Sequence, residues 1–298
     1  MDVNLELYKI FYYVAKNLSF TKAAEELFVT QSSVSQSMAQ LEKKLDIVLF
    51  HRTNRRVSLT HEGEMLFSHV SQAINIIKSG ERILENTKVL EYGELKLGAS
   101  DTICKYFLLP YFSQFHRIYP KIRINITNQP SIRTIESVRK GELDFGIINL
   151  PYDSVPNDLN VEVLSNFTEV LITNRCFFKG TEGITSIQQL MDYPLITLTK
   201  ETSTRRYLDS YFQKHQLTLE PEFELESIDL IMELVQIGLG IGFVIDAAVA
   251  ALKNEDVSII NLKEPLPTRS IAFISNKKLP LSIPAQEFLE LLSTNKAD

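Results

Sequence analysis

Short hydrogen-bonding side chains are concentrated in one stretch near the start of the chain, and none of them is bulky. A glutamine amide can pair bidentately with adenine, and a serine hydroxyl can bond a base or a phosphate. Such residues at the N-terminal end of a helix are typical of a helix that enters the major groove of DNA. The sequence therefore predicts that DNA is contacted by Thr30, Gln31, Ser32, Ser33, Ser35 and Gln36.

Three arginines lie a short distance further along, in a segment that reads as a hairpin. Residues 49–59 are typical of two short strands with Arg52, Arg55 and Arg56 at their tip. Arginines on such a wing can reach phosphates or the minor groove. We therefore expect these three side chains to contact DNA as well.

Three helices must position these groups, and the apolar pattern predicts the first over residues 4–17 and the third over residues 31–45. The second is short, and Ser19 and Thr21 are the two candidates for its N-cap. With the hairpin, the pattern predicts an all-α winged helix-turn-helix over residues 1–60. A plain three-helix domain with a polar face is the alternative, but it leaves the basic hairpin unexplained.

Residues 61–92 are predicted to form a linker dominated by one long helix. Thr60 is a suitable N-cap, and a wide apolar stripe runs along the helix. We expect a helix of a second subunit to bury this stripe; packing on its own domain is the alternative. Residues 91–93 are expected to act as a hinge. The stripe consists of Met65, Leu66, Val70, Ala73, Ile76, Ile77, Ile83 and Leu84.

The remaining two thirds of the chain alternate between short apolar strands and helical patterns, which is typical of α/β folds. The alternation runs to residue 148 and then begins again. We therefore predict two Rossmann-like lobes separated by a cleft within residues 93–298. Lobe I is expected to comprise about residues 93–165 and 268–298, and lobe II about residues 166–267.

Small hydroxyl-bearing residues recur where the predicted strands end and the next helices begin. Ligands of such sheets bind at these ends, where free helix N–H groups attract anions. The pattern predicts a cleft for a small anion such as a carboxylate, although ordinary helix capping is the alternative and Asp101 and Asp229 leave the ligand's charge open. The predicted effector contacts are Ser100, Thr102, Ser131, Asn149, Thr202, Ser203, Thr204, Arg205, Ser227 and Phe243.

Other chemistry finds little support in the sequence. The five histidines have no metal-ligand spacing, and no Ser/His/Asp constellation stands out, so we expect neither a metal nor a catalytic site nor a resident cofactor. The glycine-rich segment 238–242 follows a predicted helix, whereas a dinucleotide fingerprint follows a strand. Cys104 lies near a predicted helix N-terminus, which can lower a thiol pKa, so a redox role stays open.

Composition sets broader limits. The net charge of −6 is unevenly spread: residues 1–60 hold eight Lys and Arg against six Asp and Glu, a net of +2. DNA affinity is therefore expected to be modest, salt-dependent and reliant on several copies of the domain. No apolar run reaches membrane-spanning length, no signal peptide is evident, and two cysteines make no disulfide framework. A cytoplasmic location without membrane contact is expected.

The residues resemble the LysR-type transcriptional regulators over essentially the whole chain. The resemblance is specific over residues 5–63 and mainly architectural afterwards, where residues 141–144 and 238–242 look like recurrent segments of the family. The sequence departs from the family in the middle of the third helix, where members often carry basic residues and this chain has Ser37, Met38, Ala39 and Gln40. Phosphate contact is therefore expected to rest more on Lys43, Lys44 and the wing arginines. The matching positions are Ser19, Phe20, Ala23, Ala24, Leu27, Gln31, Val34, Ser35, Leu41, Glu42, Leu49, Phe50, Arg52, Leu59, Thr60 and Gly63.

The resemblance implies a bacterial regulator whose C-terminal domain is similar to a periplasmic binding protein and binds a small-molecule effector. It further implies a homodimer through the linker helix, usually within a homotetramer, and an effector that changes how the domains are arranged on promoter DNA. Two alternatives remain: a C-terminal domain that only assembles subunits, and an enzyme with an appended DNA-binding domain.

Overall fold

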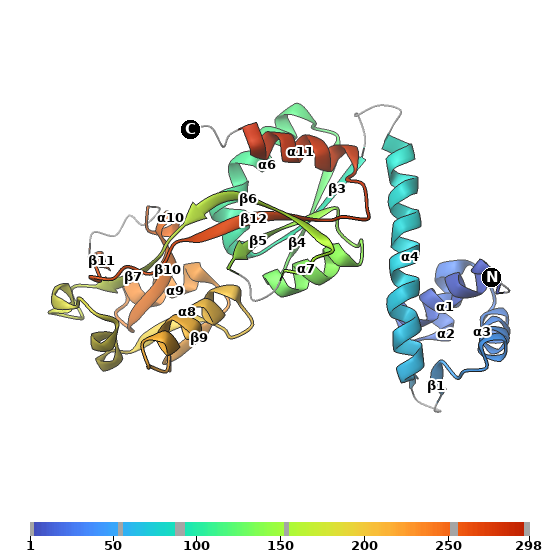
Figure 1. The fold of residues 1–298 in the computed structure, drawn as a ribbon, viewed down its shortest axis with the longest axis horizontal. Coiled ribbons are helices and arrows are strands. Elements are labelled where there is room, and N and C mark those ends of the chain that lie inside the picture. Colours follow the sequence, from blue (N-terminus) through green and yellow to red (C-terminus); the bar gives the residue numbers. More distant parts are fainter. Residues whose placement is uncertain (1–2, 53–55, 87–92, 152–154, 251–255, 295–298) are drawn as a thin grey trace. The chain divides into compact units, whose positions relative to one another are not determined.

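The computed structural model describes residues 3–52, 56–86, 93–151, 155–250 and 256–294. It divides into two compact units, Met1–Arg82 and Ile83–Asp298, each of which is described by itself. Figure 1 shows the second unit as two lobes, coloured mainly green and mainly yellow to orange. The predicted fold class, a winged helix-turn-helix followed by a two-lobed α/β domain, is confirmed. Within the described residues, no helix is both long and apolar enough to cross a membrane.

The first unit contains three short helices, a two-stranded hairpin and a long helix. Each short helix begins at a side-chain cap, because Asn4, Ser19 and Thr30 each accept a hydrogen bond from a backbone N–H two or three residues later. Ser19 rather than Thr21 is thus the second cap. The elements are α1 (Leu5–Asn17), α2 (Phe20–Leu27), α3 (Gln31–Leu45), β1 (Phe50–Arg52), β2 (Val57–Leu59) and α4 (His61–Asn86).

The hairpin is attached to the helices by apolar and polar contacts. The ring of Phe50, on β1, lies 5.5 Å from that of Phe11 and 5.6 Å from that of Phe20, between centroids. The Glu42 carboxylate on α3 accepts hydrogen bonds from the N–H groups of Leu49 (2.9 Å) and Phe50 (3.3 Å). The start of the hairpin's first strand is therefore held by both its backbone and its side chain.

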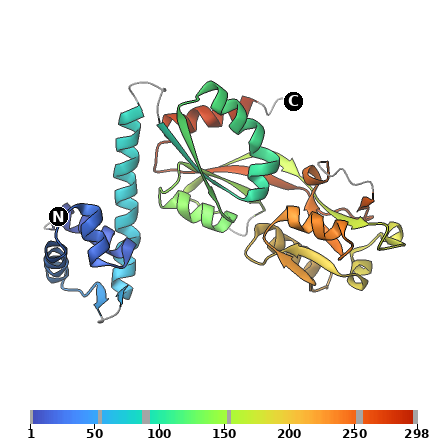
Figure 2. The ribbon, with the colours of Figure 1, turned by 180° about the vertical axis from the view of Figure 1, so that it is seen from behind.

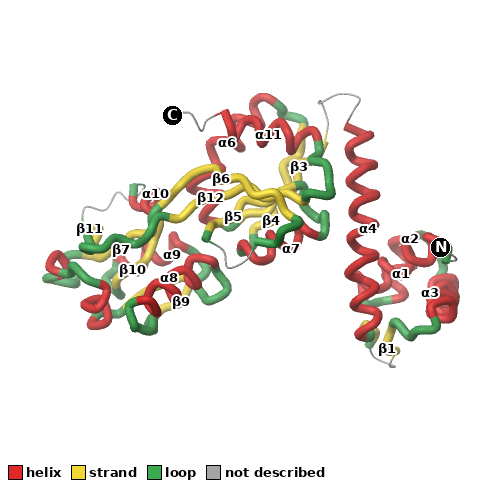
Figure 3. The backbone as a smooth tube through the Cα atoms, viewed as in Figure 1, coloured by secondary structure: helices red, strands yellow, loops and turns green. Residues whose placement is uncertain are grey.

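Lobe I of the second unit is a five-stranded sheet in the order β4-β3-β5-β12-β6. The first three strands are parallel, whereas β12 is antiparallel to both of its neighbours. Helices α6 and α11 lie on one side of this sheet and α7 on the other (Figure 3). The strands are β3 (Gly93–Ala99), β4 (Ile122–Asn128), β5 (Phe145–Leu150), β6 (Leu159–Phe167) and β12 (Arg269–Asn276); the helices are α6 (Leu109–Ile118), α7 (Ser131–Arg139) and α11 (Ile283–Thr294).

Lobe II is a second five-stranded sheet, in the order β11-β7-β10-β8-β9. Successive residues of a strand point to opposite faces, and here Leu195 packs in one apolar cluster with α8 while Ile196 packs in another with α9. The two helices therefore cover opposite faces of the sheet. The elements are β7 (Glu169–Asn174), β8 (Leu195–Leu198), β9 (Phe223–Leu225), β10 (Ile241–Ile245), β11 (Val257–Ile260), α8 (Ser203–Lys214), α9 (Ile228–Gln236) and α10 (Asp246–Val249).

The chain passes between the lobes twice. The first crossover is Thr168, between β6 and β7, and the second is the segment 261–268, between β11 and β12. Phe167 and Arg269 are opposite each other in the β6–β12 ladder, so the two crossovers meet at the same sheet end. Seen from behind, Figure 2 shows the same two connections between the lobes.

Two details of this unit differ from the expected pattern. The predicted helix over residues 105–119 is three pieces in series: α5 (Asp101–Ile103), a π-helical turn (Cys104–Leu108) and α6. The predicted helix at residues 187–191 is a 3-10 helix, Ile187–Asp192. Periodicity alone separates these helix types poorly, because they differ only in which carbonyl accepts each N–H.

Candidate DNA-binding surface and effector cleft

The predicted recognition residues lie together at the start of α3. Five of the six are exposed, and Ser35 is half-buried. The Thr30 hydroxyl lies 2.9 Å from the Ser32 hydroxyl and 2.8 Å from that of Ser33, while Gln31 Nε2 donates to Ser35 Oγ at 3.3 Å. These bonds hold the side chains in place and still leave each hydroxyl and amide with further donors or acceptors for DNA.

The wing is described only in part. Arg56 is exposed next to β2, and the backbone of Arg52 belongs to β1. The side chain of Arg52 and the whole of Arg55 lie outside the described residues. The exposed Lys43 and Lys44 occupy the last turn of α3. Contact of these cations with DNA therefore stays a prediction.

The apolar stripe of α4 is divided between two environments. Val70 is buried against the core of the first unit, and Leu66 packs against that core, as the alternative interpretation expected. Met65, Ile76 and Ile77 are exposed. A groove of about 540 Å³ between α1 and α4 continues this apolar surface. The side chains of Ile83 and Leu84 and the expected hinge at residues 91–92 lie outside the described residues.

A cleft of about 390 Å³ lies between the two lobes of the second unit. We call it the effector cleft. Eight of the ten predicted effector residues line it, four from each lobe; they are Ser100, Thr102, Ser131, Asn149, Thr202, Ser203, Thr204 and Ser227. Residues that were not predicted also line it, among them Asn128, Gln129, Glu201 and Glu226.

Two predicted effector residues are not in the cleft, and these assignments are corrected. Arg205 is 2% exposed, and its guanidinium is bonded to Asp209 (2.9 Å) and Glu224 within lobe II. Phe243 is fully packed in the apolar cluster beneath α8. A helix turns by about 100° per residue, so Arg205 points away from the side that Ser203 presents; Phe243 lies on the covered face of β10.

The cleft hydroxyls fall into two groups by their hydrogen bonds. Thr202 Oγ1 accepts from Arg205 N–H (3.1 Å) and donates to the Thr199 carbonyl (2.8 Å), so it serves as the α8 cap. The second group accepts a hydrogen bond but donates none within the described residues. In it, Ser100 accepts from Ile103 N–H (3.4 Å) and Ser131 accepts from Asn149 N–H (3.4 Å).

Ser203 belongs to the second group, because its hydroxyl accepts from an Arg269 Nη2–H at 3.5 Å. Within the described part of the chain, none of these three serine protons is donated to an acceptor. A hydroxyl that only accepts in this way keeps its proton free to donate to another group. Ser100, Ser131 and Ser203 therefore offer donors to the cleft from both lobes.

Backbone geometry adds to this donor character. The N-termini of α7, α8 and α9 all open onto the cleft through Ser131, Ser203 and Ser227. Each helix start carries unpaired N–H groups and a partial positive charge. Gln129 Nε2 is buried without a hydrogen-bond partner among the described residues. Gln129 lies between the end of a strand and Pro130, and this position in the sequence could have identified it as a cleft residue.

The charges around the cleft are acidic rather than basic. Asp101, Glu201 and Glu226 line it and are exposed, while its described lining contains no lysine or arginine. Favourable binding of an anion must therefore come from the oriented donors and helix ends. These three carboxylates also limit the negative charge that the cleft can accept.

Asp229, which had counted against an anionic ligand, is already paired. Its carboxylate accepts from Lys105 Nζ (2.7 Å) and Tyr106 Oη (2.6 Å), both on the π-helical turn of lobe I. Partial burial raises the pKa of Asp229, but these two bonds outweigh it and leave that pKa below its usual value. The contact bridges the two lobes beside the cleft.

Cys104 is not activated as its position suggested. Burial, together with the nearby Asp101, raises the pKa of the Cys104 thiol to about 11. The lowering of the pKa that a helix N-terminus can cause is therefore outweighed, because the thiol is partly withdrawn from water and lies near a carboxylate.

Comparisons with known proteins agree on the family. Residues 5–64 match the model described as "bacterial regulatory helix-turn-helix protein, lysR family", and residues 90–297 match "LysR substrate binding domain". A "probable RuBisCO transcriptional regulator" from Cyanidium caldarium is 32% identical over 271 residues, covering 87% of this chain and 83% of the relative. The "HTH-type transcriptional activator CmpR" of Synechocystis is 28% identical, covering 98% and 95%.

Solved structures show the same fold. Full-length OxyR from Pseudomonas aeruginosa superposes with a TM-score of 0.71 at 22% identity, covering 99% of this chain and 95% of that one. CbnR in complex with its target DNA gives 0.65 at 18% identity, covering 99% and 100%.

Proposed function

This chain belongs to the LysR family of DNA-binding transcriptional regulators, and on that premise we propose how its two units act. The first unit reads duplex DNA through α3 and the wing. The second binds a small effector that carries a carboxylate or similar acceptor group. The effector's preference for one arrangement of the lobes then controls transcription.

The observation that carries the effector assignment is the donor set of Ser100, Ser131 and Ser203. Two of these hydroxyls come from lobe I and one from lobe II, so a single acceptor group bound by them favours the closed cleft. The helix N-termini at the same place favour negative charge. The three rim carboxylates favour a ligand with one anionic group over a polyanion.

Thermal melting of the full chain against a panel of small carboxylates and their amides tests this assignment. A ligand that binds the native state raises the melting temperature with concentration. We expect at least one carboxylate to do so, its amide to be weaker, and Ser203→Ala to abolish the shift. Ser210→Ala, two turns further along the same face of α8 and outside the lining of the cleft, is the matched control and should keep it. A panel without any shift would refute the effector assignment.

For the DNA arm, we infer that Gln31 and Gln36 contact bases, whereas the serines and the wing cations contact phosphates or bases nearby. Selection of bound duplexes from a random-sequence pool checks this. The wild type should enrich one motif, and Gln36→Ala should relax it at one or two positions, since a good base contact discriminates by about 1–3 kcal/mol. Lys44→Ala should weaken all sequences alike. Absence of any enriched motif would contradict sequence-specific reading.

We also propose that the chain is a homodimer through α4, with a further contact that produces a tetramer. Support comes from the exposed Ile76 and Ile77 beside the groove on α1 and α4. For the further contact, support comes from the exposed apolar residues Leu109 and Ile118 on lobe I and Ile237 on lobe II. Sedimentation velocity should show a tetramer for the wild type and a smaller species for Ile77→Asp. A wild-type monomer would overturn the proposal.

A further inference from the structure

A buried ion pair lies where the chain passes between the lobes. Glu169 is the first residue of β7 and Arg269 the first of β12, so each follows a crossover directly. Both are 1% exposed, and Arg269 Nη1 lies 2.7 Å from Glu169 Oε1. We call these two residues the hinge pair, because their bond joins the two crossovers to each other.

The hinge pair also holds the first turn of α8. Thr204 Oγ1 accepts from Arg269 Nη1 (2.9 Å) and donates to Glu169 Oε1 (3.1 Å). Arg269 Nη2 donates to the hydroxyl oxygen of Ser203, a residue that lines the effector cleft. Arg269 follows the second crossover directly, and its guanidinium contacts both the strand after the first crossover and the helix end that supplies a predicted effector donor.

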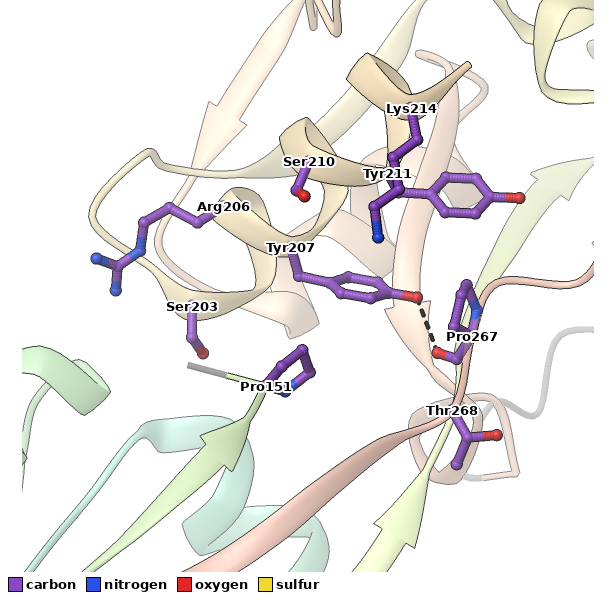
Figure 4. Close-up of a pocket in the computed structure, with 9 residues that line it drawn as sticks. All are labelled: Pro151, Ser203, Arg206, Tyr207, Ser210, Tyr211, Lys214, Pro267 and Thr268. Carbon is purple, nitrogen blue, oxygen red and sulfur yellow. Dashed lines mark hydrogen bonds between the residues drawn. The ribbon is translucent and has the colours of Figure 1, made fainter. Parts of the chain in front are cut away.

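Aromatic side chains enclose the guanidinium. Its central carbon lies 4.7 Å from the ring centroid of Tyr207 and 5.1 Å from that of Phe167. Figure 4 shows Tyr207 extending from α8 toward Pro267, where its hydroxyl donates to the backbone carbonyl at 2.8 Å. The second crossover is therefore attached to α8 twice, through Tyr207 and through Arg269.

The hinge pair is incompletely satisfied. Glu169 Oε2 and Arg269 Nε are buried without a hydrogen-bond partner among the described residues. Burial raises the pKa of Glu169, although the adjacent Arg269 lowers it. The surroundings of Glu169 therefore disfavour its negative charge. A buried ion pair with open bonding positions contributes little net stability.

We propose that the hinge pair couples the effector cleft to the two crossovers, with Arg269 as the positioning residue. This inference rests on the proposed binding of an anionic group at Ser203. Such a group draws Arg269 toward the α8 end and competes with Glu169 for its charge. Because Glu169 and Arg269 begin the strands beyond the crossovers, weakening their bond frees the lobes to change their relative angle.

The test is a measurement of anion affinity in the full chain, with acetate as the probe and acetamide as its neutral counterpart. Saturation-transfer NMR at constant ionic strength gives both dissociation constants. Glu169→Gln removes the competing charge but keeps the shape, so acetate should bind at least threefold more tightly than to the wild type, while acetamide is unchanged. The gain should vanish in Glu169→Gln combined with Ser203→Ala.

Two further variants keep the test decisive. Glu224→Gln neutralises a partner of Arg205, which is about as buried as Arg269 and lies on the same helix as Ser203. The bonds of Arg205 stay within lobe II, so acetate affinity should not change. Thr204→Val removes the hydroxyl that bridges the hinge pair with little loss of volume. It should raise acetate affinity in the same direction, even if Glu169→Gln fails to fold.

Hydrogen exchange provides the readout at the hinge. Saturating acetate should alter exchange in residues 165–170 and 266–271 together in the wild type, and in neither segment in Ser203→Ala. If acetate binds through Ser203 but Glu169→Gln and Thr204→Val leave its affinity equal or weaker, the coupling is wrong and the effector site stands. If neither acetate nor any panel compound binds, the proposed effector function fails and the coupling fails with it.

Discussion

Of the two glycines described in the first unit, Gly63 is tightly confined and Gly80 is not. A Cβ atom there would collide with the carbonyl oxygen of Leu49, next to the hydrogen bond from Gly63 N–H to Thr60 Oγ1 (2.9 Å). Gly80, further along the same helix, would place a Cβ in open space relative to the described residues. The first glycine is required by packing between α4 and the wing, and the second is not.

Gly63→Ala should therefore lower the free energy of unfolding by about 1–3 kcal/mol, because backbone must move to admit the methyl group. Gly80→Ala is the control and should raise it by about 0.5–1 kcal/mol, because alanine favours a helix interior. Urea unfolding followed by circular dichroism measures both. Equal effects at the two positions would contradict the packing argument.

The two thiols should differ in reactivity. Cys104 is half-buried, and burial raises the pKa of its thiol to about 11. Cys176 is exposed, and Asp256 together with slight desolvation raises its pKa. Alkylation by iodoacetamide at pH 7 should modify Cys176 first and Cys104 only when the domain opens. Mass spectrometry of the peptides resolves the order. Rapid oxidation of Cys104 by dilute peroxide would instead support a redox role.

At the scale of elements, the π-helical turn and α9 are joined across the lobes by Asp229. Asp229→Asn should lower the free energy of unfolding by about 1 kcal/mol at pH 7, the usual scale for a partly exposed ion pair. The folded-state pKa of Asp229 lies below 3.8, so its contribution is fully present above that pH and is lost as the pH falls through the folded-state value.

The difference between wild type and Asp229→Asn should therefore be constant from pH 7 to about 5 and shrink below pH 3.8. Urea midpoints across this range measure it. Glu136→Gln, in an exposed pair whose atoms are 3.9 Å apart, is the control and should have a smaller effect at every pH. A difference that grows on acidification would show that the bridge is not the cause.

Most elements were predictable from the sequence, and the exceptions have physical reasons. Strand β6 was not predicted, because it is the edge strand of its sheet and two of its apolar residues, Val161 and Val163, are 44% and 49% exposed. Apolar alternation normally indicates burial, and here it does not. The π-helical turn carries no residue signature that separates it from an α-helix.

At the scale of the whole molecule, the two-lobed architecture followed from the repeat of strand and helix patterns, and the polar ends of the strands indicated the cleft. The hinge pair was not predictable, because Glu169 and Arg269 are 100 positions apart and each resembles an ordinary surface charge. Arg205 was misassigned for the related reason that the sequence does not indicate which side of α8 faces the cleft. Long-range pairing decided which charges are buried.

The position of Phe167 opposite Arg269 has a consequence for the modular history of the fold. The chain leaves lobe I at the end of β6 and returns to it at the start of β12, and these two strand ends are paired. Lobe II is therefore inserted where a hairpin turn would otherwise join β6 to β12. Joining β6 to β12 by a two-residue turn would leave the five strands of lobe I in one continuous sheet. Lobe I is therefore the host module, and an entire second sheet occupies the place of a single turn.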